Sequence, residues 1–244
     1  MKILIMSLQR IGDIVMTTPT IDGLRKKYPK AKIHLLINEQ FKHIIPPIEN
    51  VDNAYFFPYK LIQTSLGEKD RSFFESYDLV DDLVRSLSAE GYDQIINLTH
   101  TRLSGWLAAL ISSPMKSGLV LNHQGIASFG SKWFEYLNRF GSRNKEEAFH
   151  FIDIFFYGAG LRGQRRVRLK ETEKGINEAN KLTLGITPYI VIQPLTSDVK
   201  KNWGFDNWKK AMQHINSVDK SRSFLLLGAP SEEIQLKKLS ELLR

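Results

Sequence analysis

An aspartate at the junction of a strand and a helix is the residue best placed for chemistry near the start of the chain. Asp13 directly follows Gly12 and the apolar run Lys2–Ser7 (KILIMS), whose composition predicts a buried parallel strand. A helix is predicted from Asp13 to Leu24, and Gly12 is expected to supply unusual backbone angles in the intervening turn. Open α/β sheets bind ligands at the carboxyl edge of their strands, so this carboxylate can act on a substrate. The competing interpretation is that Asp13 only caps the helix, because Asp favours this position.

A second group of residues, late in the chain, has the chemistry of an anion site. Tyr189–Gln193 (YIVIQ) predicts a buried strand, after which come Thr196, Ser197 and Lys201, ahead of a helix expected to begin at Phe205. A helix N-terminus presents free N–H groups to an anion, and a lysine adds a point charge. The alternative is that Lys201 is an ordinary solvated lysine of the surface.

A third polar turn, Thr99–Arg102, follows the predicted strand Gln94–Leu98 and therefore lies at another carboxyl strand end. Arg102 can pair with a phosphate, and His100 can form a hydrogen bond with a sugar. Loops at strand ends often carry function. Against this, a single histidine in a turn is usually a surface residue.

Composition limits the class of protein. The chain of 244 residues has no cysteine, which excludes disulfides, thiolate metal sites and cysteine catalysis, and its six histidines lack metal-ligand spacing, so we expect no metal. A net charge of +8 favours an anionic partner. The basic residues are dispersed and show no nucleic-acid motif, so nucleic acid is not expected, although charge alone also fits a solvated surface. No signal peptide or membrane span is predicted, which favours the cytoplasm.

Strands and helices alternate along the chain, which predicts an α/β protein with parallel sheets. The charged segment Arg162–Lys174 (RGQRRVRLKETEK) follows a cluster of glycines and marks a change of composition. We therefore expect two domains, 1–174, which includes this linker, and 175–244.

The opening of the chain resembles the family 9 glycosyltransferases, the ADP-heptose:lipopolysaccharide heptosyltransferases and their relatives. The resemblance rests on the motif from Ser7 to Pro19 (SLQRIGDIVMTTP), followed by Leu24-Arg25 and Tyr28-Pro29. Later in the chain, Lys201-Asn202-Trp203 is similar to the family's Lys-x-Trp, and Gly228–Glu232 (GAPSE) to its Gly-x-Pro-x-Glu turn. Long motifs with fixed spacing make this resemblance specific.

The resemblance implies a GT-B architecture of two Rossmann-like, doubly wound domains, the first binding the acceptor and the second a nucleotide sugar. It implies that Asp13 is the general base of an inverting transfer without a metal, and that no cofactor is needed besides an ADP-linked sugar as the donor substrate. The expected acceptor is an anionic glycolipid such as the lipopolysaccharide core, reached by a peripheral contact at the inner face of the membrane. The residues implied are Thr196, Ser197 and Lys201 for the donor diphosphate, and Arg10, Gly12, His100 and Arg102 for the acceptor.

The sequence also departs from the family pattern. Leu195 stands where family members often have Gly, and the family's Asp-(Ser/Thr)-Gly-Pro-x-His segment has no counterpart, so we expect the second domain to be incomplete. Two other functions stay open. One is a non-catalytic module that binds glycans or glycolipids or serves in assembly. The other is a dinucleotide-dependent oxidoreductase, although the turn from Ser7 to Asp13 has a single Gly instead of G-x-G-x-x-G.

Overall fold

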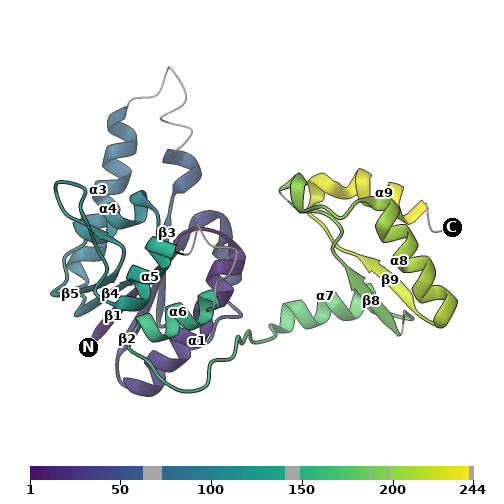
Figure 1. Ribbon diagram of the computed structural model, residues 1–244, viewed down its shortest axis with the longest axis horizontal. Coiled ribbons are helices and arrows are strands. Elements are labelled where there is room, and N and C mark those ends of the chain that lie inside the picture. Colours follow the sequence, from purple (N-terminus) through teal and green to yellow (C-terminus); the bar gives the residue numbers. More distant parts are fainter. Residues whose placement is uncertain (63–72, 141–148, 187, 197, 242–244) are drawn as a thin grey trace. The chain divides into compact units, whose positions relative to one another are not determined.

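The chain folds into two compact units in a computed structural model that describes residues 1–62, 73–140, 149–186, 188–196 and 198–241 (Figure 1). Unit 1 is Met1–Thr172 and unit 2 is Glu173–Arg244. The expected domain boundary, after residue 174, lies two residues from the boundary between the units. Each unit is described by itself below.

Unit 1 is built on a parallel sheet of five strands in the order β3-β2-β1-β4-β5. This order, with the first strand central, is that of the first five strands of a doubly wound Rossmann sheet. The central pairing sets Met6 beside Leu36 on one side and beside Asn97 on the other. The strands are β1 (Lys2–Ser7), β2 (Lys32–Asn38), β3 (Asn53–Phe57), β4 (Gln94–Asn97) and β5 (Met115–Gly118).

Helices cover both faces of this sheet (Figure 1). One face carries α1 (Ile11–Lys27), α5 (Lys132–Phe140) and α6 (Phe151–Gly158). The other face carries α3 (Phe73–Ala89) and α4 (Arg102–Leu110). A 3-10 helix, η1 (Glu39–Ile44), and a short antiparallel pair, β6 (Val120–Leu121) with β7 (Ala127–Ser128), complete the unit.

The alternation of side chains along a strand explains the two layers. Ile3 and Ile5 belong to the apolar cluster beneath α1, α5 and α6, whereas Leu4 and Met6 belong to the cluster beneath α3 and α4. All four side chains are fully buried. A strand buried on both faces must be apolar at every position, which is why the KILIMS run shows no alternation of polarity.

Two glycine predictions are corrected by the structure. Gly12 does not form a turn with unusual angles, because α1 already begins at Ile11 and Gly12 lies in its first turn. The run Lys116–Leu121 (KSGLVL) predicts a single strand, but the chain is divided at Gly118, which has a φ of 86°. A Cβ at Gly118 would overlap the carbonyl oxygen of Asn97, so only glycine lets β5 end this close to β4.

Unit 2 pairs β8 (Tyr189–Ile192) with β9 (Ser223–Leu226) in parallel. Its helices are α7 (Glu173–Thr183), α8 (Phe205–Val218) and α9 (Glu233–Glu241), with the 3-10 turns η2 (Val199–Lys201) and η3 (Pro230–Glu232). Its buried core is Ile192, Met212 and Leu239. In the part of the chain that the structure describes, no helix combines the length and the apolar character needed to cross a bilayer.

Candidate functional site

The two turns that follow β1 and β4 are joined at the carboxyl edge of the large sheet. The strands are neighbours, and the N–H of Leu98 donates to the carbonyl of Met6 (2.9 Å). The N–H of Leu8 donates in turn to the Thr99 hydroxyl (2.7 Å). The turn that carries Asp13 and the turn that carries His100 are therefore fixed to each other by backbone groups.

Asn97 supports this junction from inside the sheet. Its side chain is fully buried, its amide nitrogen donates to the carbonyl of Leu119 (2.7 Å), and its oxygen accepts from the N–H of Thr99 (3.0 Å). Ser104, also fully buried, hydrogen-bonds the same amide (3.2 Å) and the carbonyl of Thr99. Buried polar groups that are satisfied in this way hold a loop in one geometry.

Asp13 is the third residue of α1 and is half-buried. Its Oδ2 accepts from the N–H of Arg10 (3.0 Å), the residue at the N-cap. Asp13 thus helps to cap the helix, as the simpler interpretation expected, but this occupies one oxygen. Within the described residues Oδ1 makes no hydrogen bond. It remains available to accept a proton at the positive end of the helix dipole.

Two cavities meet at Asp13. The first, of about 330 Å³, is also bordered by Gln9, His100, Asn138 and the aromatic rings of Phe151 and Phe155. The second, of about 570 Å³, also borders Asp13. Its other lining residues are Leu8, Gln9, Arg10, Asn38, Tyr59, Thr99, Thr101, Leu103 and Phe151. The carboxylate therefore lies between two spaces large enough for parts of a small-molecule ligand.

His100 is held as a neutral side chain in the wall of the first cavity. The Asn138 amide donates to its Nδ1 and also to the carbonyl of Phe134 (3.0 Å), which leaves the imidazole proton on Nε2. Burial lowers the pKa of His100 to about 4, against the effects of hydrogen bonds with the Asn138 side chain and the Asn97 backbone. Nε2 is shielded from solvent, so a ligand in the cavity would reach this N–H only after a local rearrangement.

The structure brings together some of the predicted acceptor residues. His100 shares the first cavity with Asp13, and Arg10 shares the second. Gly12 and Arg102 line neither, although a Cβ on Gly12 would meet open space.

The sequence analysis did not name several polar residues of these cavities as candidates, among them Gln9, Thr99 and Asn138. Gln9 and Thr99 could have been found by their places at the ends of β1 and β4. Asn138 lies on α5, in an aromatic-rich helix, and carries no such signal.

The loop after β8 in unit 2 contains the predicted anion site. The N–H of Thr196 donates to the side-chain oxygen of Asn202 (2.8 Å), and its hydroxyl donates to the carbonyl of Asp198 (2.8 Å). Lys201 ends η2, and its side chain is exposed. Ser197 lies outside the described residues. As placed, the loop satisfies its own donors, so a ligand would have to exchange with these internal partners.

Two further features of unit 2 bear on this loop. Trp203 is 54% exposed, and its ring meets that of Trp208 edge-on, with the ring centroids 5.0 Å apart. A cavity of about 520 Å³ lies beside β9 and α9, and neither Thr196 nor Lys201 lines it. Among the described residues of the whole chain, His, Asp and Glu side chains nowhere gather in threes as a metal centre would need.

Comparison with known proteins gives consistent similarities. The family model of glycosyltransferase family 9 (heptosyltransferase) matches residues 80–244. Lipopolysaccharide heptosyltransferase 3 of Escherichia coli strain K12 is 23% identical over 209 residues, which cover 84% of this chain and 57% of that protein. The chain thus spans little more than half the length of this curated relative.

Solved structures share the fold. The family 9 glycosyl transferase of Veillonella parvula has a TM-score of 0.74 at 17% identity. The match covers 100% of this chain and 67% of the Veillonella chain. The Escherichia coli heptosyltransferase WaaC with ADP has a TM-score of 0.66 at 17% identity. The match covers 99% of this chain and 72% of the WaaC chain. At these identities the likeness establishes the fold, and it confirms the predicted α/β, GT-B class.

Proposed function

The chain belongs to glycosyltransferase family 9, and on this basis we propose that it transfers a heptose-like sugar from an ADP-linked donor to a glycolipid of the lipopolysaccharide core type. The family match and the name of the Escherichia coli relative support the reaction class and the acceptor. The observation that carries the proposal is the position of Asp13. Its carboxylate is held by the Arg10 N–H between two cavities at the carboxyl edge of the sheet.

Asp13 acts in this proposal as the general base. It removes the proton from an acceptor hydroxyl while that oxygen attacks the anomeric carbon, and the nucleoside diphosphate departs from the opposite face with inversion. General-base assistance of this kind contributes roughly 10²–10⁴-fold to a rate. The hydrogen bond from Arg10 orients the carboxylate and leaves Oδ1 to receive the proton.

The acceptor lies in the cavities beside Asp13. His100 lines the first cavity and contacts the acceptor there. Arg10, at the rim of the second cavity, supplies positive charge for an acid group of the acceptor. A glycolipid acceptor of this kind would bring unit 1 to the inner face of the membrane.

The donor diphosphate binds in this proposal at the loop after β8. Lys201 supplies the charge that neutralises the leaving diphosphate, in place of a metal ion. The Thr196 hydroxyl turns from the carbonyl of Asp198 to a phosphate oxygen when the donor arrives. The ADP bound to the Escherichia coli heptosyltransferase WaaC supports adenine as the base.

Substitution of the base tests the catalytic part. Asp13→Asn keeps a side-chain oxygen for the Arg10 N–H and removes the basic group, so transfer from ADP-heptose should fall by about 10² or more. Asp153→Asn is a control at a similar helix position, because Asp153 is likewise the third residue of a helix and accepts from its N-cap, His150 (3.2 Å). It also removes the ion pair of Asp153 with Arg165, so circular dichroism melting must verify that this variant is folded. Equal turnover by Asp13→Asn and the parent chain would overturn the assignment of Asp13.

Calorimetric titration with ADP, UDP, GDP and NAD tests the donor part separately. Selective ADP binding that is lost in Lys201→Ala supports the proposed donor loop. Glycolipid binding that persists in Asp13→Asn, with no nucleotide bound by the parent chain, would instead identify a non-catalytic module. Binding of NAD alone would identify a dinucleotide enzyme and contradict the proposal.

A further inference from the structure

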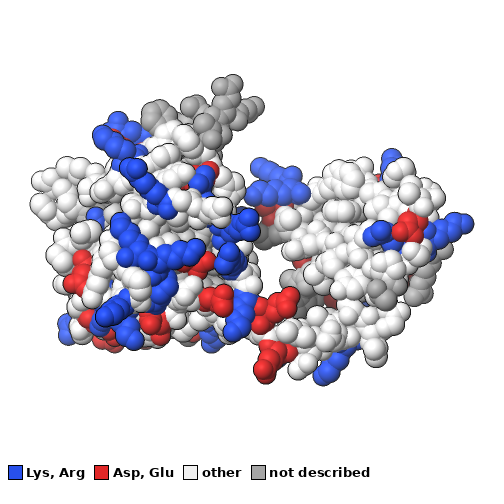
Figure 2. Space-filling view, turned by 90° about the horizontal axis from the view of Figure 1, so that it is seen from below, with Lys and Arg blue, Asp and Glu red and all other residues white. Residues whose placement is uncertain are grey.

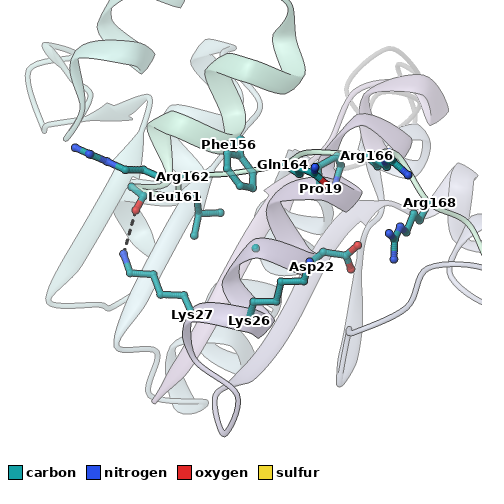
Figure 3. A pocket seen from close by; sticks show the side chains of 12 residues that line it. Pro19, Asp22, Lys26, Lys27, Phe156, Leu161, Arg162, Gln164, Arg166 and Arg168 are labelled. Carbon is teal, nitrogen blue, oxygen red and sulfur yellow. Dashed lines mark hydrogen bonds between the residues drawn. The ribbon is translucent and has the colours of Figure 1, made fainter.

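A basic cavity lies in unit 1 away from Asp13, between α1 and the segment that follows α6. Its volume is about 500 Å³, which is within the range of small-molecule sites. Five cationic side chains and one carboxylate, that of Asp22, line it (Figure 3). The cations are Lys26, Lys27, Arg162, Arg166 and Arg168.

The cavity exists because the segment 160–168 is fastened along α1. The Lys27 ammonium donates to the carbonyl of Gly160 (3.0 Å) at one end, and the Arg168 N–H donates to the Thr18 hydroxyl (3.2 Å) at the other. The segment therefore runs antiparallel to the helix, and its arginines line the cavity from the side opposite Lys26. These two hydrogen bonds hold the segment 160–168 against α1, so the cavity between them is a feature of the fold.

The floor of the cavity is apolar. Phe156 and Leu161 pack so closely on α1 that a Cβ at Gly23 would lie 2.7 Å from each of them. Pro19 continues the same surface. A ligand here would meet an apolar base and a cationic rim, which is a different environment from a flat, solvated basic surface.

The cations have few partners within the protein. Lys27 is engaged with Gly160, and it also complements the C-terminal end of the α1 dipole together with Lys26. That explanation does not extend to the arginines, which lie outside the helix. Within the described residues, the exposed side chains of Arg162, Arg166 and Arg168 make no hydrogen bond or ion pair, and the lining holds the single carboxylate of Asp22 against five cations.

The arrangement of the cations indicates the kind of ligand. Figure 3 shows Arg162 at one end of the cavity and Arg166 and Arg168 at the other, with the two lysines along the helix between them. Because the charges do not converge on one point, a single phosphate cannot reach them all. Figure 2 shows several lysines and arginines, with acidic residues among them, on the face of unit 1 that it presents. An excess of positive charge raises the local concentration of anions.

We propose that this cavity is a second ligand site, for a molecule that carries at least two phosphate groups beside an apolar part. It is independent of the proposed transferase site, since none of its lining residues borders Asp13 or belongs to the loop of Lys201. Two sources offer this chemistry: a free phosphorylated compound, and the headgroup of an anionic lipid. Arginine suits either, because its planar fork binds phosphate oxygens in pairs.

Calorimetric titration of the full chain with tripolyphosphate and with orthophosphate tests the site. We expect tripolyphosphate to bind more tightly. The triple variant Arg162→Gln, Arg166→Gln, Arg168→Gln should weaken its binding by about tenfold or more, because each arginine supplies charge-assisted hydrogen bonds. The matched control, Arg85→Gln, Lys132→Gln, Lys238→Gln, removes the same charge at exposed positions elsewhere and should change binding by less than about twofold. Circular dichroism melting verifies that both variants are folded.

Vesicle flotation distinguishes the two sources. If cardiolipin, which carries two phosphates, in phosphatidylcholine vesicles floats with the parent chain but not with the triple arginine variant, the ligand is a lipid headgroup. Tripolyphosphate binding without vesicle binding identifies a free phosphorylated compound. The proposal is overturned if both triple variants weaken binding equally, or if Lys201→Ala alone abolishes it, since the anion would then bind by net charge or at the donor loop. Loss of ADP binding with tripolyphosphate binding retained would instead affect only the proposed function.

Discussion

The two units differ in how they support their loops. In unit 1 every residue of β1 from Ile3 to Ser7 is buried, with an apolar cluster on each face of the sheet. In unit 2 the strand β8 leaves Tyr189 41% and Val191 50% exposed, and the buried core is small. The Asp13 site is therefore backed by rigid packing, whereas the loop of Lys201 rests on a thin support and bonds to itself. We infer that the Asp13 site is preorganised and that the loop of Lys201 must rearrange to bind the proposed donor.

The largest difference between the two units is expected in the unfolding free energy that is lost when one glycine in each is replaced by alanine. Gly118→Ala places a Cβ on the carbonyl of Asn97 at a φ of 86°, and it should lower the free energy of unfolding by more than about 3 kcal/mol. Gly185 in unit 2 has a φ of 75°, but no atom lies within 4 Å of the position that an added methyl group would take, so Gly185→Ala should cost about 1 kcal/mol. Urea unfolding followed by circular dichroism measures both. Equal losses would mean that the packing around Gly118 is no tighter than that around Gly185.

Low pH should reduce the free energy of unfolding of unit 1 through the protonation of His100. The pKa of His100 is about 4 in the folded chain against an ordinary 6.5, because burial disfavours the charged ring. The unfolded chain therefore binds the proton first as pH falls. The free energy of unfolding is therefore unaffected by His100 above about pH 6.5. It falls as pH is lowered from there to about pH 4, by about 3 kcal/mol in total.

Comparison of the parent chain with His100→Gln checks this loss. Unfolding free energies measured across the same pH range should fall less steeply in the variant. Some slope should remain, since burial also lowers the pKa of His34. The difference between the two proteins should be constant above about pH 7.5, where both states hold a neutral ring. Parallel curves down to about pH 4 would contradict the buried, neutral state of His100.

The smallest effect is expected at the exposed apolar residues of unit 2. Leu184 is 85% exposed and Ile234 is 72% exposed. The double variant Leu184→Gln, Ile234→Gln should change the unfolding free energy by less than about 0.5 kcal/mol. It should nevertheless reduce concentration-dependent association in sedimentation velocity, because exposed apolar side chains favour contact between molecules. A loss of several kcal/mol would show that these residues are packed, and unit 2 would then resemble unit 1.

Much of the fold followed from sequence patterns alone. The run KILIMS, the helix after it and the strands β4 and β8 are local features, each predicted from a few neighbouring residues. The local patterns failed at Gly12 and Gly118. Gly12 continues a helix that the pattern started two residues too late, and Gly118 bends a strand because of Asn97, which is distant in sequence.

Local patterns were sufficient for the parallel sheet, for the strand–helix junction that carries Asp13, and for the family to which the motif points. Which side chains share a space depended instead on tertiary packing. His100 meets Asn138 across 38 positions, and the Arg168 N–H reaches Thr18 across 150. Such contacts depend on how whole helices pack on a sheet, since local propensity carries no information about partners so far away. The cavity at Asp13 and the basic cavity on α1 both arise in this way.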